Sequence, residues 1–221
     1  MYTHTSALRP HGGYRRLRSF QVTEIIYDAT VSFCDRFINK RSRTHDQMVQ
    51  AARSGRQNIA EGSRASATSS QTELRLVNVA RASLDELLLD YEDFLRQRGL
   101  PAWGKDDPQA REVREVGKEN PTDRSDASSY ARWLNHADAA VVANTLICLI
   151  HQANYLLDRQ ISGLEKQFIN EGGYSERLHA ARLEERRKSC KNPTDSSDRT
   201  DRSDAKLCPA CGQLMILRTA R

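Results

Sequence analysis

The chain has 221 residues, of which 38% are hydrophobic and 29% charged, and its formal net charge is +5 at pH 7. This length suits one domain of ordinary size with tails, and the apolar share is below that of an average globular domain, so part of the chain must lie outside a core. The five cysteines are odd in number and mostly scattered, which argues against a disulfide framework.

Two further observations concern membranes and targeting. The N-terminus, "MYTHTSALRPHGGYRR", lacks the apolar segment of a signal peptide. The longest apolar run, "AAVVANTLICLI" at residues 139–150, is shorter than the ~20 residues that cross a bilayer. We therefore expect a cytoplasmic protein with no membrane association.

Charge is unevenly distributed along the chain. Residues 1–62 carry a net charge of +5, residues 63–173 a net charge of −4, and residues 174–221 a net charge of +4. Such asymmetry is typical of proteins that contact nucleic acid or another subunit, and it does not decide between them.

The first two predicted helices lie in the basic N-terminal part. Apolar residues at steps of three and four predict a helix over residues 14–38. A second helix follows through "QMVQAARSGRQNIAEG", with Thr44 or Asp46 as its N-cap and Gly62 as its stop.

The third predicted helix is the most regular, with its apolar residues spaced alternately by three and four from Val77 to Phe94. Its expected N-cap is Ser69, Ser70 or Thr72, and "RGLP" ends it because glycine and proline break helical geometry. Residues 102–127 then form a polar interruption, with a short helix over "PQAREVREV".

A fourth helical pattern runs from Tyr130 to Ile169 and is apolar on most sides. Such a helix is buried, so we expect partners on several of its faces, including another subunit. "EGGY" breaks this pattern, and a fifth, charged helix over "SERLHAARLEERRK" follows.

These patterns predict an all-α protein, because no β-rich run of useful length is present. We expect a four-helix bundle at residues 12–170 and a C-terminal helix at 171–190. "NPTDRSDA" at 120–127 recurs, stretched, in the Asp- and Ser-rich segment after residue 190, so we expect a disordered linker at 191–206. A cysteine-containing segment occupies 207–221.

One stretch carries a family resemblance. "RTHDQMVQAARSGRQNIAEGSRASATSSQTELRLVNVARASLDELLLDYEDFL" resembles the bacterial four-helix-bundle proteins, which include ribosomal-RNA intervening-sequence proteins and accessory proteins of diversity-generating retroelements. "GGYRRLRSFQVTEIIYDATVSFCDRF" and "HQANYLLDRQISGLEKQF" extend the resemblance to roughly residues 12–190. With its charged fifth helix, the chain is most similar to the variant called four-helix-bundle suffix proteins.

The resemblance implies an up-down-up-down bundle. It also implies a homo-oligomer, since relatives assemble as rings, typically pentamers. Retroelement members bind nucleic acid and a reverse transcriptase through basic surfaces. The family has no known catalytic activity, so the resemblance implies that this chain is not an enzyme.

The stretch "SGRQNIAEGS" is rich in small residues, which let helices approach closely. Asn58 can bond a neighbouring backbone at the helix end, and Glu61 needs a basic partner there, with Arg56, Arg64 or Arg81 as candidates. We expect helix packing at this turn, with a ligand or nucleic-acid pocket as the alternative.

Catalytic constellations are not found in the sequence. It contains no glycine-rich phosphate loop, no His-Glu-x-x-His and no Gly-x-Ser-x-Gly. Cys148 and His151, one turn apart, could be a nucleophile and its base, but we expect core residues, and we expect His136 on the same helix to be exposed. An acidic cluster is expected to form a solvated helix face: Asp85, Glu86, Asp90, Glu92 and Asp93.

Basic runs make nucleic acid the leading partner. "YRRLRSF", "NKRSRTH" and "RLEERRKSCK" could hold a DNA or RNA backbone with salt-dependent, sequence-tolerant contacts. The candidate binding residues are Arg15, Arg16, Arg18, Lys40, Arg41, Arg43, Arg186, Arg187 and Lys188. The alternative is a protein–protein scaffold or accessory subunit with no nucleic-acid contact.

The C-terminal "CPACGQLMILRTAR" contains one metal half site. Cys208 and Cys211 have the spacing of a zinc knuckle, but structural zinc takes four ligands. The stretch resembles the first half of the four-cysteine zinc ribbon of bacterial type I topoisomerases, whose second pair would lie beyond Arg221. We therefore expect a truncated ribbon and no cofactor, with zinc only if another subunit or a longer chain completes the site. Cys190 is the only other nearby thiol and is expected to be a poor third ligand.

Overall fold

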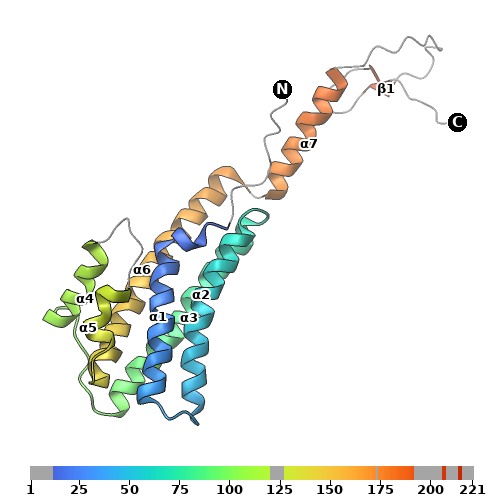
Figure 1. The fold of residues 1–221 in the computed structure, drawn as a ribbon. Helices are drawn as coiled ribbons and strands as arrows, with labels where there is room; N and C mark the ends of the chain where they lie inside the picture. Colours follow the sequence, from blue (N-terminus) through green and yellow to red (C-terminus); the bar gives the residue numbers. More distant parts are fainter. Residues whose placement is uncertain (1–11, 120–126, 173, 192–205, 208–213, 216–221) are drawn as a thin grey trace. The chain divides into compact units, whose positions relative to one another are not determined.

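The computed structural model describes residues 12–119, 127–172, 174–191, 206–207 and 214–215 (Figure 1). The chain divides at Gly172 into two units, and the first, Leu8–Glu171, contains every helix except the last. Helices account for nearly all of the described structure, so the all-α prediction is confirmed.

Four long helices enclose the core of the first unit. α1 packs on α2 and α6, and α3 packs on the same two helices. A one-turn 3-10 helix, η1, precedes α1 and contacts α2. The bounds are η1 (Tyr14–Arg16), α1 (Arg18–Phe37), α2 (Arg43–Ala65), α3 (Ser70–Gln97) and α6 (Ala139–Glu171).

Three shorter elements lie between α3 and α6 in the chain: α4 (Pro108–Glu119), η2 (Ala127–Tyr130) and α5 (Ala131–Leu134). α4 and α5 pack on α6, and they bury Val113 and Trp133, with 1% and 7% of their surfaces exposed. The short helix predicted over "PQAREVREV" within the polar interruption is confirmed as α4, which extends to Glu119. α4 and α5 cover part of the apolar surface of α6, while Tyr155, Phe168 and Ile169 remain exposed, so the oligomer stays a prediction.

The fourth helical pattern is broken before α6. α5 ends at Leu134, and α6 begins at Ala139, nine residues after the predicted start at Tyr130. Asp138 causes the new start, because its Oδ1 accepts from the backbone N–H of Ala140 at 2.8 Å. A capping side chain that bonds the first free amides fixes where a helix begins.

α2 differs from the prediction at both ends. Ser42, not Thr44 or Asp46, is the N-cap, and its hydroxyl accepts from the Thr44 N–H at 3.2 Å. Gly62 does not stop the helix, which continues to Ala65. Gly62 instead lies at the contact with α3, where a Cβ would be 3.4 Å from the Glu73 carbonyl oxygen. Close helix packing, rather than a left-handed turn, explains this glycine.

Gly55 lies in close contact with α3. A Cβ on Gly55 would lie 2.9 Å from Leu84 Cδ2 and 3.1 Å from Leu84 Cγ, and Leu84 is fully buried. Gly55→Ala is therefore expected to lower the free energy of unfolding by about 1–3 kcal/mol, because overpacking outweighs the gain in helix propensity.

The matched control for this prediction is Gly163→Ala in α6. Gly163 is exposed, and a Cβ there would meet nothing within 4 Å. This change is expected to raise the free energy of unfolding by about 0.5–1 kcal/mol, through helix propensity alone. Urea denaturation followed by circular dichroism measures both variants, and equal effects of the same sign would contradict the close approach at Gly55.

The ends of α3 agree with the prediction. The Ser69 hydroxyl accepts from the Thr72 N–H at 3.1 Å, which makes Ser69 the N-cap. Beyond the C-terminus, Gly99 takes a φ of +62°. The N–H of Gly99 donates to the Arg96 carbonyl at 3.2 Å, and that of Leu100 donates to the Leu95 carbonyl at 2.9 Å, as in a Schellman motif.

A buried asparagine holds the segment that follows α3. Asn144 on α6 accepts from the Trp103 N–H at 2.8 Å. Its Nδ2 donates to the carbonyls of Pro101 at 2.9 Å and Ala140 at 2.8 Å. The segment between α3 and α4 is thus fixed to α6 by side-chain bonds to its backbone.

The second unit contains α7 (Tyr174–Lys191) and two short antiparallel strands, β1 (Lys206–Leu207) and β2 (Leu214–Met215). α7 confirms the predicted charged helix. The strands were not predicted, and they pair Lys206 with Met215 and Leu207 with Leu214. The linker predicted at 191–206 and the pair Cys208 and Cys211 lie almost wholly outside the described residues, so the domain boundaries there stay predictions.

Among the described residues, one helical segment, Ala139–Asn170, is long and apolar enough to cross a membrane by length and composition alone. The apolar run at 139–150 is thus only part of a longer apolar helix. Within its most apolar stretch, 56% is buried inside the protein, as in a core helix.

Candidate nucleic-acid interface

The structure separates the basic residues that the sequence grouped together. Arg15 and Arg16 lie before α1, whereas Lys40, Arg41 and Arg43 lie after its end. α1 has 20 residues, and a helix of that length spans ~30 Å. The remaining predicted residues, Arg186, Arg187 and Lys188, are exposed on α7 in the second unit. The first unit therefore has two basic ends rather than one patch.

The side chains of three predicted residues form a hydrogen bond or an ion pair within the protein: Arg18, Lys40 and Lys188, whose Nζ lies 3.4 Å from Glu184 Oε1. Arg18 is half-buried and donates through Nη2 to the Gly117 carbonyl at 2.8 Å, which connects α1 to α4. Lys40 Nζ lies 3.3 Å from Asp35 Oδ1. Arg18 therefore has a structural role, and the charge of Lys40 is partly neutralised on an exposed surface.

The outer face of α2 joins the two basic ends. Arg43, Arg53 and Arg64 are exposed along it, at steps of ten and eleven residues, which are about 2.8 and 3.1 helical turns. In the part of the chain that the structure describes, none of the three forms an ion pair. An arginine without a carboxylate partner keeps its full charge for a bound anion. We call these three residues the arginine face of α2.

η1 continues this face beyond the end of α2. The guanidinium carbons of Arg15 and Arg64 lie 5.4 and 5.3 Å from the centroid of the Tyr14 ring. Arg64 Nη2 also lies 3.4 Å from the Tyr14 hydroxyl. Farther along, Arg56 covers the ring of Tyr27 at 4.3 Å. Half-buried tyrosines thus hold guanidinium groups at the surface by cation–π contact.

The sequence analysis did not identify Arg53, Arg56 and Arg64 as nucleic-acid-binding residues. It considered runs of adjacent basic residues, and these three arginines are separated along α2. Their helical periodicity was the available signal, since residues 53, 56 and 64 project from one side of an ideal helix.

α3 has the opposite charge. It carries three arginines against six carboxylates, a net charge of −3, whereas α2 carries four arginines against two carboxylates, a net charge of +2. Two of the α3 arginines are paired: Arg81 with Asp158 at 2.6 Å, and Arg96 with Asp93 at 2.6 Å. The field outside the bundle is therefore positive along α2 and negative along α3.

The predicted acidic cluster lies on α3 and is mainly solvated. Asp85, Glu86, Glu92 and Asp93 are exposed. Asp90 is half-buried, and burial raises the pKa of its carboxyl, with smaller contributions from the charges of Glu86 and Asp93. The interpretation as a solvated face is thus correct for four of the five residues.

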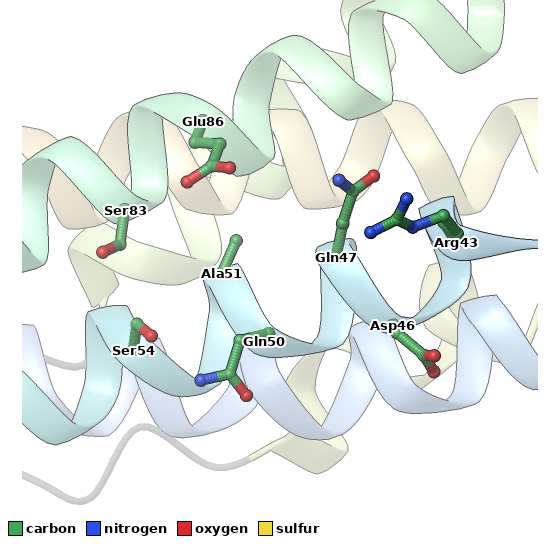
Figure 2. Close-up of a pocket in the computed structure, with 8 residues that line it drawn as sticks. All are labelled: Arg43, Asp46, Gln47, Gln50, Ala51, Ser54, Ser83 and Glu86. Carbon is green, nitrogen blue, oxygen red and sulfur yellow. The ribbon is translucent and has the colours of Figure 1, made fainter.

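A polar groove lies between α2 and α3 (Figure 2). In it, Figure 2 shows the guanidinium of Arg43 beside the amide of Gln47, with Glu86 across the groove on α3. The lining residues are Arg43, Asp46, Gln47, Gln50, Ala51, Ser54, Ser83 and Glu86. On the α2 side, arginine and glutamine donors border the groove together with the carboxylate of Asp46, and the carboxylate of Glu86 stands on the α3 side.

The "NIAEG" stretch lies within α2, and its described contacts are those of helix packing. Asn58 donates to the Ser54 carbonyl within its own helix at 2.9 Å. Glu61 is exposed and has no ion pair among the described residues, so the expected arginine partner was wrong. The packing of Gly55 and Gly62 against α3 explains the small residues of this stretch.

The described cysteines and histidines do not form a catalytic pair. His151 is exposed, and Cys148 is half-buried, with its thiol pKa raised by burial. Burial also raises the pKa of Cys34 to about 12, with smaller contributions from Asp35 and Asp90. Both shifts disfavour the reactive thiolate. His136 is exposed as expected, but it lies in the turn before α6 rather than on that helix.

Within the described ranges, no group of three His, Cys, Asp or Glu side chains could hold a metal ion. Cys208 and Cys211 lie outside these ranges, so the half site stays a prediction, as does the absence of a cofactor.

Comparison with known proteins gave no relatives. No family model matches the chain, and neither a curated protein nor a solved structure matches it.

Proposed function

We propose that this protein is a non-enzymatic helical-bundle protein that binds nucleic acid through the basic surface of η1 and α2. The observation that carries the proposal is the set of exposed, unpaired arginines on that surface, next to a neighbouring helix whose arginines are largely paired. Guanidinium groups match phosphate geometry and remain charged at all physiological pH values.

Family membership and assembly are part of the same proposal. The resemblance of residues 12–190 supports a four-helix-bundle suffix protein that is cytoplasmic and homo-oligomeric. The connections between α1 and α2 and between α2 and α3 are short, which supports the up-down-up-down arrangement. A ring would repeat the basic surface in each subunit, and multivalency would strengthen weak individual contacts.

A binding titration at two salt concentrations tests the proposal. Fluorescence anisotropy with labelled DNA and RNA at 50 and 200 mM salt should show binding that weakens steeply. Five phosphate contacts, from Arg15, Arg16, Arg43, Arg53 and Arg64, predict a loss of roughly 10²–10³-fold over that range. No binding at 50 mM salt, or binding unaffected by salt, would refute the proposal and favour the protein–protein scaffold.

A further inference from the structure

We propose that the arginine face of α2 binds duplex nucleic acid through its phosphates, and does not bind single strands by base stacking. This inference rests on the proposed function, and it names the ligand class and the contacting residues. Three features of the surface carry it: its covered aromatic rings, the spacing of its arginines and the residues between them.

The aromatic rings of this surface are already covered. Proteins that bind single strands without sequence preference stack bases on exposed aromatic side chains. Here Tyr14 and Tyr27 are half-buried, and guanidinium groups lie over both rings. Phe20, which packs edge-on against Tyr14 at 4.8 Å, is 7% exposed. A base would have to displace an arginine in order to stack, so stacking is disfavoured.

The most exposed aromatic side chains lie elsewhere. Among the large apolar side chains exposed in the described residues, two are aromatic, Tyr155 and Phe168, with 60% and 39% of their surfaces accessible. Both are on α6, which packs mainly against α1, α3, α4 and α5. Neither is on η1 or α2, so these two elements contribute no exposed aromatic side chain among the described residues.

The spacing of the arginines suits a rigid ligand. Steps of ten and eleven residues place Arg43, Arg53 and Arg64 ~15 and ~16 Å apart along the helix axis. The row thus spans ~31 Å, the length of about nine base pairs at 3.4 Å each. A duplex presents phosphates at fixed positions over that length, whereas a flexible strand must first be ordered, which opposes binding.

Two exposed amides and two exposed carboxylates lie between the arginines. Gln47 and Gln50 are exposed and can donate to phosphate or sugar oxygens. Asp46 and Glu61 are exposed and repel phosphate, although His45 Nδ1 lies 3.5 Å from Asp46 Oδ1. These carboxylates weaken the attraction, so a single subunit should bind in the ~10⁻⁴–10⁻⁶ M range of non-specific contacts.

The test compares four probes: a 20-base-pair DNA duplex, an RNA duplex of the same sequence, and one single strand of each. Fluorescence anisotropy of the full chain should show both duplexes bound at least tenfold more tightly than the single strands. The triple variant Arg43→Gln/Arg53→Gln/Arg64→Gln should bind duplex roughly 100-fold more weakly. Its slope of log affinity against log salt should be smaller by about 2.7, because three phosphate contacts are lost.

The matched control also removes three positive charges, two from α3 and one from the residue that caps its C-terminus. Arg75→Gln/Arg96→Gln/Arg98→Gln changes three exposed arginines in the acidic region of the bundle. This variant should change duplex affinity by less than about threefold and leave the salt slope unchanged, since distant charges are screened. Circular dichroism of both variants verifies that the helices remain folded.

The outcomes separate the inference from the proposed function. If single strands bind as tightly as duplexes, or if the α3 control loses as much affinity as the α2 variant, the inference is overturned while nucleic-acid binding stands. If no probe binds at 50 mM salt, the proposed function itself fails. Tighter duplex binding that is lost with the α2 variant alone supports both.

Discussion

Phe33→Ala is expected to lower the free energy of unfolding by about 3–5 kcal/mol, a large share of the 5–15 kcal/mol typical of a domain. Phe33 is fully buried on α1. Its ring centroid lies 5.0 Å from that of Tyr91 and 4.9 Å from that of Phe94, both in edge-to-face geometry, and 5.2 Å from that of Phe37. Removing the ring loses apolar burial and leaves a cavity between α1 and α3.

Urea denaturation measures this loss of stability, and two further variants serve as comparisons. Phe33→Leu keeps most of the volume and should cost about 1.5 kcal/mol or less, because leucine can partly refill the space. Phe168→Ala removes a ring that is 39% exposed on α6, and it should cost well under 3 kcal/mol because less surface leaves water. A Phe33→Ala loss no larger than that of Phe168→Ala would contradict the aromatic core described here.

Asn144→Leu is expected to lower the free energy of unfolding by about 2–4 kcal/mol, because it leaves two backbone groups without partners. Asn144 is 2% exposed. It is the partner of the Trp103 N–H and the Pro101 carbonyl in the segment between α3 and α4. Leucine has a similar volume, so the loss comes mainly from the unpaired polar groups rather than from a cavity.

Hydrogen exchange adds a local measurement to the denaturation. The Trp103 amide should exchange faster in Asn144→Leu, because its acceptor is gone. Asn78→Leu is the control: Asn78 is exposed and donates to the Leu74 carbonyl one turn earlier, as Asn144 does to Ala140. It should change stability by no more than about 0.5 kcal/mol. Equal losses in the two variants would show that Asn144 does not fix this segment.

Several arginines of the candidate surface could be predicted from the sequence. Which of them have partners within the protein could not. The basic runs located Arg15, Arg16 and Arg43, which lie at the two ends of the arginine face. Arg18 belongs to the same run, yet it donates to Gly117, 99 residues later in the chain. Which arginines have partners depends on contacts between distant residues, and no local pattern contains that information.

For the helices too, some features follow from the local sequence and others from tertiary contacts. Local periodicity determined α1, α2, α3 and α7, because the apolar stripe of a helix and the breaks around Gly99 and Gly172 are properties of short segments. Local signals failed for Gly62, whose role depends on the approach of α3 to α2. A glycine can either end a helix or allow a close contact, and only the position of the neighbouring helix decides between these roles.

The sequence by itself determined that this is an all-α protein with a basic N-terminal part and an acidic middle, because composition and periodicity are local quantities. Only the tertiary structure decided that α4 and α5 cover α6, and that Arg43, Arg53 and Arg64 are exposed without ion pairs among the described residues. Burial and charge pairing depend on which segments meet in space. Which segments meet follows from the packing of the whole bundle. In it, Phe33 and Tyr91 are in contact although they are 58 residues apart in the sequence.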